Sequence, residues 1–301
     1  MDYNKTYNKI LTDEEFMEIK PHGSSAYPFQ YYYDNLELFD FHCIEWHWHR
    51  EFEFLYVESG EVTCGIGEKQ IILSEGEAIF INSKILHRFY APSGGIIPNF
   101  VCMPEFIAPE NSLIYKKYIL PIISSNIYFQ RFQTDELWQT KIIQTMIKIM
   151  EMQENEKIRE LATLALVQDL WLTFYENVKL SDKGDVQTVD EVAQKRVQLI
   201  MQYIHENYNH NLSLDEIASH IGISKSTALN LFHRFLHTTP VNYLIGYRLQ
   251  AASWLLKNTN KKVKTIAYES GFHNVDYFCR LFKKHYHLTP SEYRCICLKR
   301  V

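Results

Sequence analysis

The chain has 301 residues, which is long enough for two folded domains. Of these residues 46% are hydrophobic and 14% aromatic, a composition that excludes a disordered chain. No apolar run approaches the roughly 18 residues that a membrane-spanning helix requires, which excludes a helical membrane protein. The net charge of −5 is unevenly distributed, because residues 1–188 carry 16 Lys and Arg against 28 Asp and Glu, whereas residues 189–301 carry 15 against 8; the second part is therefore the one expected to meet a polyanion.

Short strands are predicted from residue 36 to about residue 102. Residues 51–57 and 77–81 are rich in β-branched and aromatic side chains, and Gly-containing turns separate the segments. Many short strands at this spacing are typical of a β-barrel or sandwich. The aromatic stretch 26–40 before them has two interpretations: it packs on the barrel, or it offers stacking faces to a ligand.

Two histidines and four glutamates lie in the strand-like stretch IEWHWHREFEFLYVESG, residues 44–60. Because alternate residues of a strand share a face, His47, His49 and Glu53 would lie on one side and the aromatic residues on the other. Alternation does not say which side is inside. Taken alone, it favours the aromatic side toward the core and the polar side toward water, with each histidine a satisfied structural residue.

Two amphipathic helices are predicted over residues 134–153 and 156–178, with Thr134 as the N-cap of the first. A short polar turn joins them, so we expect an antiparallel hairpin. The second helix is too apolar for one partner to cover, which indicates a dimer contact. The alternative is that both helices simply cap the barrel. The polar segment 181–190 is predicted to be the interdomain linker.

The last hundred residues contain a repeat. IASHIGISKSTALNLFHRFLHTTPVNYL begins at Ile217, and IAYESGFHNVDYFCRLFKKHYHLTPSEYR begins at Ile266. Gly222 and Gly271 match at an offset of 49 residues, within a pattern of short helix, Gly-containing turn and second helix. This pattern predicts two helix-turn-helix motifs, and their position in the basic part of the chain indicates DNA binding.

The second helix of each copy is expected to enter the DNA. Ser224 and Asn274 would cap these helices, and Pro240 would begin a long helix of about 26 Å that separates the two copies. The outward faces carry the small polar, amide and basic groups that read base edges and phosphates. The predicted DNA-binding residues are Lys225, Ser226, Thr227, Leu229, Asn230 and His233 in the first helix, and Asp276, Cys279, Arg280, Lys283 and Lys284 in the second.

The stretch from about residue 212 to residue 294 resembles the DNA-binding domain of the AraC/XylS family of bacterial transcription regulators. The segment GFHNVDYFCRLFKKHYHLTPSEYR resembles the family's second helix-turn-helix motif. The chain departs from the family pattern at His237 and His287, where a Gly just past the helix end is usual. The resemblance implies that the base-facing residues are Ser226, Leu229 and Asn230 in the first helix, and Asp276, Cys279 and Arg280 in the second.

A second resemblance concerns the histidine-rich strand. The spacing H-x-H-x3-E-x6-G over residues 47–60 resembles the first cupin motif, and G-x10-H over residues 76–87 resembles the second, with Asn and Lys in place of the usual Pro and Gly. The resemblance implies a cupin barrel with four inward-pointing side chains, His47, His49, Glu53 and His87. These would bind a divalent metal such as Mn, Fe, Ni or Zn, or line a pocket for a small effector, or be purely structural.

The expected fold is α+β and multidomain. It comprises a cupin-like effector-binding β-barrel (1–133), a helical hairpin for dimerisation (134–180), the linker (181–190) and an all-α AraC-type DNA-binding domain with two helix-turn-helix motifs (191–301). The expected function is sequence-specific binding of double-stranded DNA by a homodimeric transcription regulator under the control of a small effector, for which a sugar is one candidate.

The alternative is a metal-dependent cupin enzyme fused to a DNA-binding domain, but the sequence offers no catalytic set beyond the four candidate ligands, so a non-enzyme is expected. The six cysteines form no CxxC pair, and the N-terminus lacks the apolar stretch of a secretion signal. Both features predict a cytoplasmic protein with no contact with membranes.

Overall fold

The computed structural model describes residues 10–13, 16–39, 42–179 and 191–299, which form two compact units on either side of the segment 180–190. The predicted linker, residues 181–190, lies outside the described residues. In the described part of the chain, no helix is both long enough and apolar enough to cross a lipid bilayer.

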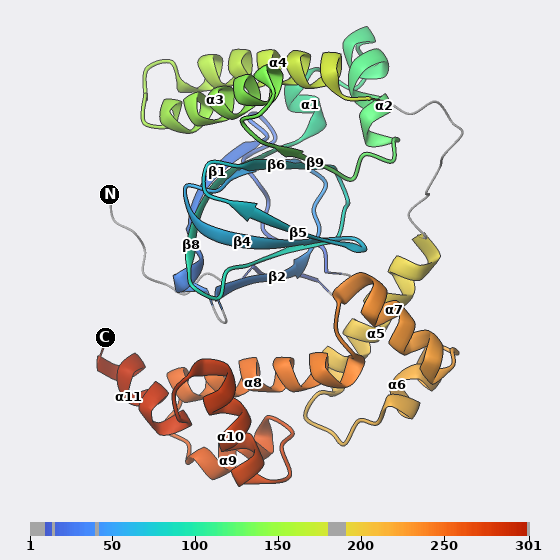
Figure 1. Cartoon of the computed structure of the whole chain (residues 1–301), viewed down its shortest axis with the longest axis vertical. Coiled ribbons are helices and arrows are strands. Elements are labelled where there is room, and N and C mark those ends of the chain that lie inside the picture. Colours follow the sequence, from blue (N-terminus) through green and yellow to red (C-terminus); the bar gives the residue numbers. More distant parts are fainter. Residues whose placement is uncertain (1–9, 14–15, 40–41, 180–190, 300–301) are drawn as a thin grey trace. The chain divides into compact units, whose positions relative to one another are not determined.

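The first unit is built on an antiparallel sheet that folds over on itself (Figure 1). Its strands are β1 (Phe29–Asn35), β2 (Cys43–His47), β3 (Phe52–Tyr56), β4 (Ser59–Ile66), β5 (Lys69–Ser74), β6 (Ala78–Ile81), β7 (His87–Tyr90), β8 (Gly95–Cys102) and β9 (Phe129–Phe132). The order along the sheet is β2-β7-β4-β8-β3-β6-β9, with β1 paired to β8 and β5 to β4. The predicted cupin-like, β-rich first unit is confirmed, but the sheet begins with β1, inside the aromatic stretch 26–40.

Both faces of β3 are buried. Phe52 and Phe54 are fully buried and belong to a core that includes Trp171 from the helical layer. Leu55 belongs to a second core inside the barrel, and Glu53, on the same face, is 4% exposed. The interpretation that placed the polar face in water is therefore wrong: the aromatic face packs on helices, so the polar face turns inward.

The helical hairpin consists of α3 (Leu137–Met152) and α4 (Arg159–Asn177), which pack against each other and across one face of the sheet (Figure 1). Shorter helical segments precede it, namely Leu36–Leu38, α1 (Pro104–Ile107), Tyr115–Ile119 and α2 (Leu120–Ile123). The N-cap prediction for Thr134 is wrong. The cap of α3 is Glu136, because residues 134–136 remain in a turn in which the Thr134 carbonyl accepts a bond from the Thr140 hydroxyl.

The second unit is helical throughout its regular structure. Its helices are α5 (Glu191–Asn207), α6 (Leu214–His220), α7 (Lys225–Leu236), α8 (Pro240–Asn258), α9 (Val263–Glu269), α10 (Val275–Tyr286) and α11 (Pro290–Lys299). The predicted caps are confirmed, because the side chain of Ser224 accepts a hydrogen bond from the Thr227 N–H and that of Asn274 accepts one from the Tyr277 N–H. Pro240 occupies the start of α8, as predicted.

The two helix-turn-helix motifs, α6–α7 and α9–α10, have the same turn. In the first, the N–H of Gly222 donates to the Ser219 carbonyl, and in the second the N–H of Gly271 donates to the Tyr268 carbonyl. Both glycines have a positive φ, +68° and +81°. His237 and His287 also adopt the left-handed conformation, with φ of 50° and 59°, at the C-caps of α7 and α10. Both helices therefore end in the left-handed C-cap conformation, which Gly adopts most readily.

Candidate functional site

Four side chains from separate parts of the barrel meet in its interior. His47 ends β2, His49 follows it, Glu53 is on β3 and His87 begins β7. β2 and β7 pair so that His47 and His87 are register partners, and one candidate ligand atom from each of the four residues lies within 4.8 Å of the others. Each residue is 5% exposed or less. The structure thus brings together all four residues that the sequence selected.

Backbone carbonyls fix the orientation of two of the imidazole rings. The Nδ1 of His47 donates to the Glu45 carbonyl at 2.8 Å, and the Nδ1 of His87 donates to the Ile85 carbonyl at 2.7 Å. A neutral ring that donates from Nδ1 presents a lone pair at Nε2. Such bonds are what hold metal-ligating histidines in position.

The buried Nε2 of His87 has no hydrogen-bond partner, although it lies 3.0 Å from the Glu53 carboxylate. Because His87 donates from Nδ1, its Nε2 carries a lone pair, and this lone pair faces the Glu53 carboxylate oxygen, which is also an acceptor. A cation bound between the two atoms would remove the repulsion between them. His49 adds its Nε2 at 3.4 Å from the same carboxylate oxygen. Three imidazoles and one carboxylate therefore fit a divalent transition metal, which would supply Lewis acidity and a fixed point of attachment for a ligand.

The ionisation of the group supports the same conclusion. Burial lowers the pKa of His47 well below its usual value, and the neighbouring His87 and His49 lower it further. Burial alone would raise the pKa of Glu53, but the adjacent imidazoles of His49 and His87 outweigh burial and hold this pKa far below its usual range. A neutral imidazole and an ionised carboxylate are the forms that coordinate metals.

A second set of polar side chains borders His49. His22 lies 3.1 Å from Glu18 (Nε2 to Oε2) and 2.9 Å from the Tyr32 hydroxyl (Nδ1 to Oη), and its ring centroid is 5.4 Å from that of His49. Glu51 approaches His49 from another side, with 3.6 Å between Oε2 and Nδ1. The interior of the barrel is thus lined by several carboxylates.

This second set was missed by the sequence analysis because Glu18 and His22 precede the predicted strands and belong to no motif. They reach the barrel because Trp48 exchanges backbone hydrogen bonds with Phe16 and Glu18, which adds a short piece of strand to the end of β2. Only Tyr32 gave a signal, through the aromatic stretch 26–40. Phe29 packs in the core, which confirms the packing interpretation for that residue, whereas Tyr32 contacts His22 and the ligand-stacking interpretation stays a prediction.

The predicted DNA-binding residues lie on one side of α7 and of α10, opposite the buried Ala228, Phe232, Phe278 and Phe282. Leu281 of α10 is half-buried. The exposed residues are Lys225, Ser226, Asn230, His233, Asp276, Arg280, Lys283 and Lys284, and the half-buried ones are Thr227, Leu229 and Cys279.

One neighbour of Arg280 was not predicted. The guanidinium of Arg280 lies over the ring of Tyr277, 5.5 Å from its centroid, and Tyr277 is 40% exposed.

Lys225 pairs with Asp215, but both side chains are more than half exposed, so this ion pair contributes little to stability. The DNA-facing assignments of these residues stay predictions.

Comparison with known proteins agrees with both units. Residues 217–295 match the family model of a helix-turn-helix domain, and residues 43–97 match that of a cupin domain. The uncharacterized HTH-type transcriptional regulator YdeC of Bacillus subtilis is 24% identical over 95% of this chain and 98% of its own length. The lactose operon transcription activator of Staphylococcus xylosus is 26% identical over 58% of this chain and 60% of its own.

Among solved structures, an AraC-type transcriptional regulator from Chromobacterium violaceum is 29% identical, covers 36% of this chain and 96% of its own, and superposes with a TM-score of 0.34. The helix-turn-helix model spans both copies of the duplicated motif, and the cupin model spans the strands that carry the four convergent side chains. The chain is a transcription regulator of the AraC type, with an N-terminal cupin domain and a C-terminal DNA-binding domain that carries two helix-turn-helix motifs.

Proposed function

We propose that this regulator binds a specific DNA sequence as a homodimer and that a small molecule in the barrel controls the binding, without catalysis. The observation that carries the proposal is the enclosed group of His47, His49, Glu53 and His87 in the same chain as two helix-turn-helix motifs. A ligand that favours one arrangement of the two units would shift the population that binds DNA. The free cysteines of the described residues, among them the buried Cys43, Cys64 and Cys102, fit a reducing cytoplasm.

DNA recognition is testable at two basic residues of α10. We expect Arg280→Ala to weaken binding to a selected operator by about 1–3 kcal/mol and to relax the preference at one base pair, because a guanidinium reads guanine edges. Lys283→Ala should instead weaken binding to all sequences and reduce the salt dependence. The operator is first selected from random DNA with the full-length protein, and affinities are then measured at several salt concentrations.

Two outcomes would contradict these assignments. An equal loss of affinity for operator and unrelated DNA in the Arg280 variant would show that this side chain contacts phosphate only. An unchanged salt slope in the Lys283 variant would remove that residue from the DNA interface.

The chemistry of the barrel interior favours a neutral, hydroxyl-rich effector held with or by a divalent metal. Glu18, Glu51 and Glu53 all border the histidines and would repel an anionic ligand, whereas carboxylates accept hydrogen bonds from hydroxyl groups. Burial raises the pKa of nearby Asp34 to about 6, and the charges of Glu53 and Glu18 raise it in the same direction. A sugar fits this lining, and one relative is named as a lactose operon activator.

Metal binding is tested by replacing one ligand. We expect the full-length protein to bind a divalent transition metal with one-to-one stoichiometry, and Glu53→Gln to weaken its affinity by at least about tenfold, because the carboxylate supplies the only negative charge among the four groups. The control is Glu61→Gln, an exposed carboxylate on β4. Calorimetric titration of metal-free protein gives both affinities.

Purified protein that takes up no stoichiometric metal would contradict the metal site and exclude the alternative of a metal-dependent enzyme. The effector pocket is tested separately, by the thermal shift that neutral sugars produce in the full-length protein relative to sugar acids.

Dimerisation is proposed through the outward face of α4. Ile158, Leu161, Ala165 and Leu172 are spaced by three, four and seven residues, which aligns them on one stripe. Leu161 and Leu172 are 74% and 56% exposed, although the opposite face of the helix is packed in the core. A second copy of this stripe is the partner of matching shape and chemistry.

We expect Leu172→Glu to convert the dimer to a monomer at micromolar concentration, because it places a charge in an apolar contact. Leu137→Glu, at a leucine that is 92% exposed at the start of α3, is the matched control and should leave the dimer intact. Analytical ultracentrifugation measures both; a wild-type chain that is monomeric throughout would remove the interface.

A further inference from the structure

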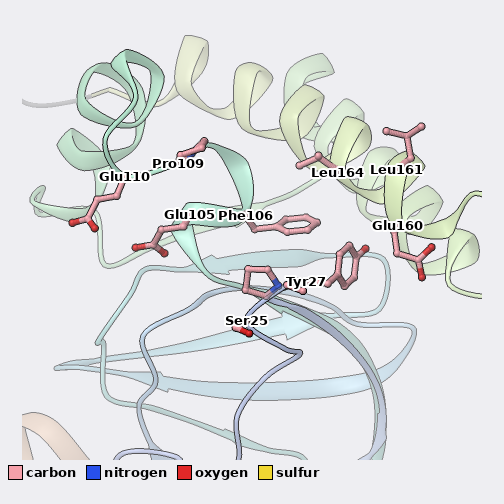
Figure 2. Close-up of a pocket in the computed structure, with 11 residues that line it drawn as sticks. Ser25, Tyr27, Glu105, Phe106, Pro109, Glu110, Glu160, Leu161 and Leu164 are labelled. Carbon is pink, nitrogen blue, oxygen red and sulfur yellow. The ribbon is translucent and has the colours of Figure 1, made fainter.

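A cavity of about 630 Å³ opens on the outside of the barrel, away from the four-ligand group. It lies between the segment that precedes β1, the short helix α1 with the residues that follow it, and the first turns of α4 (Figure 2). A volume of this size is within the range of about 300–1,000 Å³ that small-molecule sites occupy. None of the residues that line it belongs to the barrel group or to the helix-turn-helix motifs.

The middle of the cavity is aromatic and apolar. The rings of Tyr27 and Phe106 meet edge to face, with 5.1 Å between their centroids, and Leu164 of α4 forms the neighbouring wall. Figure 2 shows the two rings between acidic side chains, with Glu105 and Glu110 on one side and Glu160 on the other. Aromatic faces next to carboxylates attract a cation both through the ring quadrupole and through charge.

The three carboxylates are not equivalent. Glu160 accepts hydrogen bonds from Arg159 at 3.1 and 2.8 Å, so its charge is largely compensated. Glu110 is exposed, and Glu105 is half-buried. The Oε2 of Glu105 is a buried oxygen for which the described residues provide no hydrogen-bond donor. A buried acceptor in this state is costly unless a ligand supplies the donor.

An acid in the first turn of a helix also offsets the helix dipole, which explains Glu160 at the start of α4. This role does not account for Glu105 equally well, because α1 has only four residues and its dipole is correspondingly small. In addition, the described lining contains three carboxylates and no lysine or arginine, and the neighbouring Arg159 is paired with Glu160, so the charges favour a cationic ligand over an anionic one.

We propose that this cavity binds a small organic cation in which an ammonium group is joined to an apolar or aromatic body. The body lies against Tyr27, Phe106 and Leu164, and the ammonium donates to the buried Glu105 oxygen, with Glu110 adding to the attraction. Binding here is independent of the barrel group and of DNA.

The test uses three probes with one body and different charge: phenethylamine, phenethyl alcohol and phenylacetate. Calorimetric titration of the full-length protein at neutral pH is expected to show the amine binding at least about tenfold more tightly than the alcohol, with phenylacetate weakest. Equal affinities for the amine and the alcohol would overturn the proposal, because the carboxylates would then have no part in binding.

Variants locate the bound amine. Glu105→Gln should weaken amine binding by about tenfold and leave the alcohol unchanged, and Leu164→Trp should abolish binding by filling the cavity. The matched controls are Glu176→Gln, an exposed acid on the same helix, and Glu53→Gln in the barrel, and neither should alter amine affinity. Unchanged binding in the Glu105 variant, or loss of binding in the Glu53 variant, would place the amine elsewhere and overturn the proposal.

Discussion

Replacing Trp171 with alanine is expected to lower the free energy of unfolding of the first unit by about 3–5 kcal/mol. The indole is 4% exposed and lies stacked on Phe52, with 4.8 Å between ring centroids and 19° between their planes. Its N–H donates to the Tyr118 carbonyl at 3.1 Å. The substitution therefore removes the side chain that joins α4 to β3 and leaves both a cavity and an unpaired carbonyl.

The matched control is Trp254→Ala, since Trp254 lies on α8 of the second unit and is 57% exposed. That change should alter stability by no more than about 0.5 kcal/mol. Urea unfolding of the full chain, followed by the fluorescence of the remaining tryptophans, measures both. A loss in the Trp171 variant no larger than that in the Trp254 variant would mean that the helical hairpin does not share a core with the sheet.

Gly271→Ala is expected to destabilise the second unit by about 2–4 kcal/mol. Gly271 has a φ of +81°, and a Cβ at this position would lie 2.4 Å from the Tyr208 carbonyl oxygen and 2.8 Å from Nε of Arg248. These two atoms are joined by a hydrogen bond of 2.7 Å. An added methyl group therefore both strains the turn of the second helix-turn-helix motif and disrupts the bond that ties α8 to the residue after α5.

The duplicated motif supplies the control. Gly222 occupies the same position in the first copy, with a φ of +68°, but a Cβ there meets no atom within 4 Å. Gly222→Ala should therefore lower the free energy of unfolding by only about 1 kcal/mol, which is the strain of placing alanine at a positive φ. Thermal unfolding followed by circular dichroism compares the two variants. Equal losses would show that the close approach at Gly271 relaxes without penalty.

The second unit was predictable in detail because local residue types determine its helix ends and turns, and because the same motif occurs in two copies. Caps such as Ser224 and Asn274, the turn glycines and the proline that begins α8 act within a few residues of their position, so the sequence fixes them without knowledge of tertiary contacts. Thr134 shows the limit of this reasoning, since a residue with good capping chemistry loses its role when the chain remains in a turn.

The barrel interior was predictable only in part. His47, His49, Glu53 and His87 were found because their spacing matches a known motif, whereas the alternation of β3 alone pointed the wrong way. Alternation assumes that one face of a strand is exposed to solvent, and β3 is buried on both faces. Glu18 and His22 were not predictable, because their position depends on a strand addition at Trp48 that no local pattern encodes.

The burial of β3 on both faces has a practical consequence for engineering. Alternate side chains of this strand serve either the helical layer or the barrel interior, so a substitution chosen to change one is constrained by a closely packed neighbour on the other. Libraries aimed at a new ligand preference are better built on Glu18, His22 and Tyr32. Those positions face the histidines, and they lie outside the strand that joins the two cores.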